Sequence, residues 1–321
     1  MNSSTHHSFS ADDSSEEPLF QADQILERIS NLNQRLNDPE SLSPDELLEL
    51  VNTATTLLIH QERNMQALKG GYEEALAKLN LEMSQVRDVQ ESLLPEYPPE
   101  IEGLDFACEY LPSGHASGDY YDFLTPTDEL VGSFVADVSG HGAPSAVVMA
   151  ITRVLVQEHL RSTQSAGEAL SKINSLMHRF IPGSLYVTGV YLLYNHQTHD
   201  FQYATAGHPA PIIWRNAEKK AAPLPIKARF PLKFLPEVDY ESLESHLDPG
   251  DLLVFYTDGI TELTNGGGEM VEQAGLLQWV ENAPKETASG FLWGLLDQAS
   301  CHTGGVPPED DFTVVVLRRE E

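Results

Sequence analysis

The residues most able to do chemistry in this sequence are acids that follow short apolar stretches. Four such groups occur along the chain: Gly118-Asp119, Ala136-Asp137-Val138, Thr257-Asp258-Gly259 and Glu309-Asp310-Asp311. An Asp beside a Gly at a strand end usually marks a hairpin turn, so no single group indicates a function. Gathered together they would, because two bare carboxylates about 4 Å apart repel by about 4 kcal/mol at an effective dielectric of about 20. Divalent cations would remove that repulsion.

The type of ligand atom indicates which metal ions could bind and which reaction they could support. No set of His or Cys residues accompanies the acids, and oxygen ligands alone favour Mg²⁺ or Mn²⁺ over Zn²⁺. Two such ions about 3.5–4 Å apart lower the pKa of a bound water, so that hydroxide attacks phosphorus in line. The sequence has no G-x-x-x-x-G-K-[ST] loop, no G-x-S-x-G elbow and no reactive-cysteine signature around Cys108 or Cys301. The acids therefore predict two-ion phosphoryl hydrolysis without a protein nucleophile.

The elements that must position these acids are mostly short strands. Apolar, β-branched or aromatic segments bounded by turn residues predict strands at 104–110, 130–137, 185–194, 200–206, 210–214, 251–257 and 312–318. Residues 145–160 and 167–180 are apolar at helical spacing, so we expect two consecutive helices packed on one face of a sheet. Prolines and glycines predict loops at 216–250 and 265–275. The pattern is typical of an antiparallel α+β protein.

The N-terminal part of the chain has a different composition. Residues 1–18 are rich in Ser, Asp and Glu and predict a disordered acidic tail. Residues 19–94 follow a helical pattern whose apolar spacing of three and four fits a coiled-coil seam, interrupted by Glu82, and fits an antiparallel helical hairpin equally well. Either arrangement offers a surface for self-association, so we expect a homodimer. Pro95 ends the helix, and residues 95–321 form the predicted catalytic domain.

The overall composition excludes several classes of protein. The chain has 321 residues, with 19 Lys and Arg against 49 Asp and Glu, and a formal net charge of −30. Such a charge repels nucleic acid backbones and anionic membranes, so we expect neither as a partner. Two cysteines are too few for a disulfide framework. The polar, acidic start is not a secretory signal, and no run of 18 apolar residues occurs. We therefore expect a cytoplasmic protein.

Several separated motifs occur in an order that resembles one known family. They are SGDYYDF, VADVSGHGAPSAVVMA, ATAGHPAPII, VFYTDGITE and EDDFTVVVL, with a Gln-x-x-Leu-Leu-Pro lead-in at Gln90 to Pro95. The set is similar to the SpoIIE/RsbU group, the bacterial branch of the PPM metal-dependent serine/threonine protein phosphatases, from roughly Gln90 to Leu317. The resemblance implies an α+β fold, a PPM-like antiparallel β-sandwich flanked by helices, here preceded by a helical segment.

The resemblance also implies roles for individual residues. Asp137 resembles the carboxylate that bridges two metal ions, and Val138 would offer its backbone carbonyl to one of them. Asp258 and Asp310 resemble the direct ligands of the other ion, and Asp119 resembles an acid that acts through metal-bound water. Asp310 is preferred over Asp311 because Asp-Asp-x-Thr aligns with the family's Asp-Asn-x-Ser/Thr, although a one-residue shift is open.

Two histidines and the first motif depart from simple expectations. Ser117-Gly118-Asp119 stands where Gly-Gly-Asp is common in this group. Ser139 holds the position at which eukaryotic relatives have a His that is thought to protonate the leaving group. His141 lies two residues further on, and either a catalytic or a structural role is open for it. We expect His208, in Gly207-His208-Pro209, to belong to a turn.

The function implied by the resemblance is hydrolysis of phosphoserine or phosphothreonine in a protein. The usual substrates of the group are STAS-type anti-sigma-factor antagonists in bacterial partner-switching pathways. The expected cofactor is a pair of Mn²⁺ or Mg²⁺ ions, and a regulatory partner could dock on the N-terminal helices, with residues 85–94 passing its effect to the metal site. The alternatives are a catalytically silent scaffold or phosphoprotein-binding module, and a two-metal nuclease or phosphodiesterase. The negative charge and the lack of His ligands argue against the last of these.

Overall fold

The computed structural model describes residues 30–31, 34, 43–114, 116–160, 163–227 and 230–321. The predicted acidic tail and most of residues 19–42 lie outside this described part. The chain divides into two compact units, Met1–Ala77 and Lys78–Glu321, which we describe separately. None of the helices in the described part combines the length and the apolar character needed to span a membrane.

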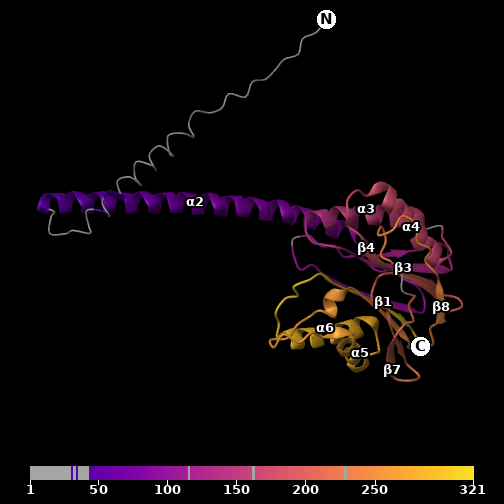
Figure 1. Cartoon of the computed structure of the whole chain (residues 1–321). Helices are drawn as coiled ribbons and strands as arrows, with labels where there is room; N and C mark the ends of the chain where they lie inside the picture. Colours follow the sequence, from indigo (N-terminus) through magenta and orange to yellow (C-terminus); the bar gives the residue numbers. More distant parts are fainter. Residues whose placement is uncertain (1–29, 32–33, 35–42, 115, 161–162, 228–229) are drawn as a thin grey trace, which may run out of the picture. The chain divides into compact units, whose positions relative to one another are not determined.

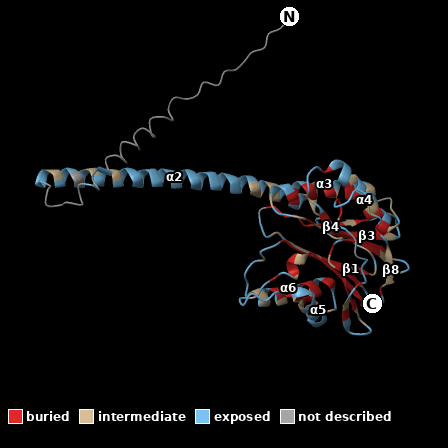
Figure 2. Cartoon of the chain, viewed as in Figure 1, coloured by how far each residue is buried: buried red, intermediate tan, exposed pale blue. Residues whose placement is uncertain are grey.

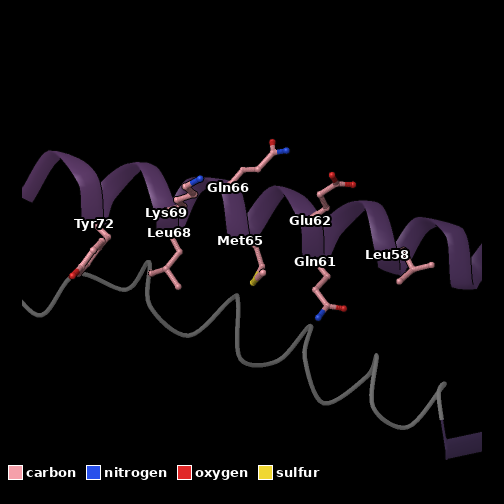
Figure 3. A pocket seen from close by; sticks show the side chains of 8 residues that line it. All are labelled: Leu58, Gln61, Glu62, Met65, Gln66, Leu68, Lys69 and Tyr72. Atoms are coloured by element: carbon pink, nitrogen blue, oxygen red, sulfur yellow. The ribbon is translucent and has the colours of Figure 1, made fainter. Parts of the chain in front are cut away.

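The described part of the first unit is mainly the long helix α2 (Pro44–Leu93), whose last turns belong to the second unit. Its start is a capping box, because the Ser43 amide donates to Glu46 Oε2 at 2.9 Å and the Glu46 amide donates to Ser43 Oγ at 3.4 Å. Figure 3 shows a pocket along this helix whose lining includes Leu58, Met65 and Leu68. These side chains are between 65% and 75% exposed. These apolar side chains, spaced seven and three residues apart, form a stripe of the coiled-coil type that no described residue covers.

The second unit contains two five-stranded sheets, and every described strand pairing in them is antiparallel. One sheet has the order β1-β10-β9-β6-β7, and the other has the order β2-β3-β4-β5-β8. The strands of the first sheet are β1 (Leu104–Leu111), β10 (Phe312–Arg319), β9 (Leu252–Tyr256), β6 (Ile212–Arg215) and β7 (Lys220–Pro223). Those of the second are β2 (Tyr120–Leu124), β3 (Leu130–Val138), β4 (Val187–Asn195), β5 (Asp200–Ala206) and β8 (Leu243–His246).

The sheets pack face to face and helices cover their outer faces, so the unit has four layers (Figure 1). Helices α3 (Ala143–His159) and α4 (Ala166–Phe180) pack on the sheet that contains β3. Helices α5 (Glu272–Asn282) and α6 (Ala288–Thr303) pack on the sheet that contains β9. The central strands are therefore buried on both faces, and Figure 2 shows them in red. This explains why their sequences are apolar runs without clear alternation.

The predicted antiparallel α+β architecture agrees with this fold, and the structure adds elements that the sequence analysis did not list, among them strand β2 (Tyr120–Leu124). Short strands β7 and β8 occur within 216–250, which was predicted to be loop. Each has four residues and lies at the edge of its sheet, so an apolar period of two is barely visible in its sequence. Helices α5 and α6 were not predicted because glycines such as Gly275 and Gly294 weaken their pattern.

Candidate metal centre

The strand ends bring the predicted acids to one edge shared by the two sheets. Asp137 is the next-to-last residue of β3, and Asp119 directly precedes β2 in the same sheet. Asp258 opens the short 3₁₀ helix η4 (Asp258–Ile260) after β9, and Asp310 lies two residues before β10, its neighbour in the other sheet. The antiparallel register of β2 with β3 and of β9 with β10 places these positions at matching ends.

Asp137, Asp258 and Asp310 form an open group of mutually repelling carboxylates. Burial, followed by the charges of Asp258 and Asp310, raises the pKa of Asp137 to about 7. Burial and then the charge of Asp310 also raise the pKa of Asp258. The charges of Asp258 and Asp310 thus disfavour ionisation of Asp137, and the charge of Asp310 disfavours ionisation of Asp258. The structure brings these three predicted residues together.

A further acid joins this group that the sequence analysis did not assign. Glu262 is exposed, and its pKa is raised by partial burial and then by the charges of Asp258 and Asp310. Its amide donates to the carbonyl of Asp258 at 2.9 Å, so one helical turn joins the two residues. The spacing of four residues between two acids after a strand was the available signal.

Asp119 lies deeper than the other acids. It is only 1% exposed, and its Oδ2 accepts hydrogen bonds from Thr257 Oγ1 at 2.8 Å and from Thr313 Oγ1 at 2.6 Å. Burial, followed by the charge of Asp137, raises its pKa well above the usual range. Asp119 therefore connects the ends of β9 and β10 to the sheet that carries Asp137. Its predicted action through metal-bound water remains a prediction.

The backbone before Asp119 approaches the end of β3 very closely. The Val138 amide donates to the carbonyl of Gly118 at 3.2 Å. A Cβ atom on residue 118 would lie 2.6 Å from the Val138 carbonyl oxygen and 3.2 Å from Asp137 Oδ1. Glycine is therefore required at 118 by this approach, while Ser117 at the departure from Gly-Gly-Asp causes no such conflict.

Asp310 and Asp311 have different surroundings. Asp311 is 8% exposed, and its carboxylate accepts hydrogen bonds from the Ser113 amide at 2.8 Å, from Ser113 Oγ at 3.1 Å and from the Gly118 amide at 2.9 Å. Asp310 is exposed beside Asp258. The oxygens of Asp311 are thus engaged in holding the loop before Asp119, which supports Asp310 as the available ligand.

The two histidines differ in exposure, as Asp310 and Asp311 do. His141 is exposed in the turn between β3 and α3, and its role stays open. His208 is 3% exposed, and its Nδ1 lies 2.9 Å from Oγ1 of Thr188, the residue opposite Asp137 in the β3–β4 register. Burial lowers the pKa of His208 to about 3, so the ring is neutral at physiological pH. A neutral, buried ring is not the form that donates a proton to a leaving group.

The donor set fits hard divalent cations. The described residues contain no group of three or more His, Cys, Asp or Glu side chains already arranged to hold an ion. Mg²⁺ and similar ions need no such cage, because they keep several waters and take only one or two carboxylates each. Asp137, Asp258, Asp310 and the carbonyl of Val138 supply oxygen donors of this kind. A bound divalent cation would offset the repulsion between these carboxylates, which favours cation binding.

Comparisons with known proteins place the chain in a family. The family model described as Stage II sporulation protein E (SpoIIE) matches residues 127–320. Phosphoserine phosphatase RsbU from Bacillus subtilis (strain 168) is 28% identical over 255 residues, which cover 79% of this chain and 74% of RsbU.

Two solved structures have the same fold. The RsbU and RsbW domains of a Mycobacterium tuberculosis protein are 26% identical with a TM-score of 0.59, over 69% of this chain and 61% of that chain. The SiaA-PP2C domain of Pseudomonas aeruginosa is 16% identical with a TM-score of 0.68, over 76% of this chain and 98% of that chain. The predicted α+β PPM fold and the predicted phosphatase family are confirmed. The chain belongs to the SpoIIE family, the bacterial branch of the PPM protein serine/threonine phosphatases.

Proposed function

We propose that this chain removes phosphate from phosphoserine or phosphothreonine of a protein, with two Mn²⁺ or Mg²⁺ ions held by Asp137, Asp258, Asp310 and the Val138 carbonyl. One observation carries the proposal: Asp137, at the end of a strand of one sheet, lies close enough to Asp258 and Asp310, at strand ends of the other sheet, for their charges to raise its pKa. Acids whose pKa values are raised by burial and by neighbouring acids cluster at functional sites. Metal dependence is expected for the family.

Some residues of the site would bind the metal ions, and others hold the loop before Asp119 in place. The ions, when bound, supply positive charge to the phosphoryl oxygens and lower the pKa of the attacking water. Asp119 ties β9 and β10 to the first-motif loop through Thr257 and Thr313. Asp311 holds the same loop from the other side. The support beneath the open acids is therefore built from neutral hydroxyls, backbone amides and buried carboxylates.

The substrate proposed is a small phosphorylated protein of the STAS type in a partner-switching pathway. RsbU, the relative with 28% identity, is named a phosphoserine phosphatase. The Mycobacterium tuberculosis relative carries RsbU and RsbW domains in one structure. The net charge of −30 disfavours nucleic acid as an alternative substrate.

The N-terminal segment is proposed to dimerise and to receive a regulatory partner. Leu58, Met65, Leu68 and Tyr72 are exposed along α2 at heptad-like spacing. A second copy of the same seam would bury them in a coiled coil.

Turnover by purified protein tests the proposal. We would measure hydrolysis of p-nitrophenyl phosphate and of a phosphoserine peptide with Mn²⁺, with Mg²⁺ and with chelator, for wild type, Asp137→Asn and Asp258→Asn. Asp239→Asn is the matched control, because Asp239 is an exposed acid away from the four strand ends. We expect metal-dependent turnover that only the two site variants lose. Metal binding without turnover on either substrate would favour the silent scaffold instead.

A further inference from the structure

The last turns of α2 contact the loop that leads to Asp119. Gln90 is 3% exposed, and its side-chain amide pairs with the backbone of a single residue in that loop. Its Nε2 donates to the carbonyl of Ser117 at 2.8 Å, and its Oε1 accepts from the amide of Ser117 at 3.1 Å. The guanidinium of Arg87, one turn earlier, donates to the carbonyl of Gly114. The end of α2 thus supplies hydrogen-bond partners to the backbone of this loop.

From Ser117 the constraint continues directly to the metal centre. The amide of Asp119 donates to Ser117 Oγ at 3.0 Å. The amide of Gly118 donates to Asp311 Oδ2 at 2.9 Å, and its carbonyl accepts from Val138 at 3.2 Å. Residues 117–119 are thus fixed by three neighbours: the end of α2, the residue before β10 and the end of β3.

Packing alone does not explain an amide at position 90. Leu94, on the same helix end, already packs against both the layer between the sheets and the layer under α3 and α4. A buried polar side chain is costly unless all its groups are paired, and Gln90 pairs both its oxygen and its nitrogen with one peptide unit on each side of Ser117. Its removal would leave the Ser117 amide and carbonyl without these partners.

We propose that Gln90 is a positioning residue that couples the end of α2 to metal affinity. By fixing Ser117, it sets the approach of Gly118 to Asp137 and Val138 and the orientation of Asp119. The proposal deepens the proposed function and rests on it for the identity of the metal site.

Three variants of the full chain separate positioning from simple stability. Gln90→Met keeps the length of the side chain and loses both hydrogen bonds. Gln90→Glu keeps an acceptor for the Ser117 amide and loses the donor to the Ser117 carbonyl. Gln85→Met is the control, because Gln85 is exposed on the same helix end. The readouts are the Mn²⁺ dissociation constant by calorimetry, thermal unfolding in chelator, and kcat and KM for p-nitrophenyl phosphate at saturating Mn²⁺.

We expect Gln90→Met to weaken Mn²⁺ binding roughly tenfold, the size expected when one or two hydrogen bonds are lost, with Gln90→Glu between it and wild type. Saturating Mn²⁺ should restore kcat, and Gln85→Met should match wild type in every readout. The proposal is overturned if Gln90→Met binds Mn²⁺ as tightly as wild type, whether or not it melts at a lower temperature. It is also overturned if the folded wild type binds no Mn²⁺. Mn²⁺ binding is measured without substrate. A wild type that binds Mn²⁺ without turnover therefore contradicts the proposed function, while the Mn²⁺ affinities of Gln90→Met and wild type still test the role of Gln90.

Discussion

Replacing Asp137 by Asn should stabilise the metal-free protein at alkaline pH, although Asp137 is a proposed metal ligand. The pKa of Asp137 is raised from 3.8 to about 7, so the folded protein holds this proton more tightly than the unfolded chain does. The stability that the protonated carboxyl contributes is complete below about pH 3.8 and is lost as the pH rises through about 7. Asparagine cannot ionise and avoids the loss.

The size of the effect follows from the same pKa. A full difference between 3.8 and about 7 corresponds to at most about 4 kcal/mol of stability at about 1.4 kcal/mol per pH unit. Because Asp137 is half-buried and solvent screens its neighbours, we expect about 2 kcal/mol at pH 8. In a domain of this size that corresponds to a rise in Tm of about 4–8 °C.

The assay is thermal unfolding of wild type, Asp137→Asn and the exposed control Asp239→Asn from pH 4 to pH 8, with chelator and with Mn²⁺. In chelator, the advantage of Asp137→Asn should be small at pH 4 and should grow up to pH 8. Mn²⁺ should raise the Tm of wild type and of the control but not that of Asp137→Asn. A wild type that is more stable than Asp137→Asn in chelator at pH 8, or a difference independent of pH, would refute the reasoning.

Three further predictions concern the loop, the paired acids and the helix. Gly118→Ala should lower stability by about 1–3 kcal/mol and weaken Mn²⁺ binding, since its Cβ would lie 2.6 Å from the Val138 carbonyl oxygen; chemical denaturation and calorimetry measure both, and unchanged values would contradict the close approach. Asp310→Ala should weaken Mn²⁺ binding without loss of stability in chelator. Asp311→Ala should lower the free energy of unfolding by about 2–3 kcal/mol, because it removes three hydrogen bonds. The reverse pattern would make Asp311 the metal ligand and Asp310 the residue that supports the loop. Leu68→Glu should convert a dimer to a monomer in sedimentation experiments, and a wild-type monomer would exclude the proposed seam.

The fold and the open acids could be predicted because their signals are local. Asp137 lies at the end of an apolar strand and Asp258 two residues after another, and strands buried on both faces leave continuous apolar runs in the sequence. The order of the motifs then matched one family, which the comparisons confirmed. The assignment of individual metal ligands still rests on the resemblance and on the geometry described above.

The supporting contacts could not be predicted, because they join residues far apart in the chain. Thr257 and Thr313 reach Asp119 across 138 and 194 residues. Asp311 reaches Gly118 across 193 residues, and the sequence, which favoured Asp310 as the ligand, left a one-residue shift to Asp311 open. Gln90 belongs to a recognised lead-in motif, but nothing in its sequence neighbourhood indicates that its amide pairs with Ser117. Only a fold places such partners together.

The central claim is that acids from two sheets hold divalent ions for phosphate hydrolysis, and a parallel Mn²⁺ titration of wild type and Asp258→Asn tests it most directly. Binding by calorimetry and release of phosphate from a phosphoserine peptide would be measured on the same samples. We predict that wild type binds two Mn²⁺ ions per chain, that turnover rises as they bind, and that Asp258→Asn loses both at least one ion and turnover. Turnover that is unchanged in chelator, or an Asp258→Asn variant as active as wild type, would contradict the account.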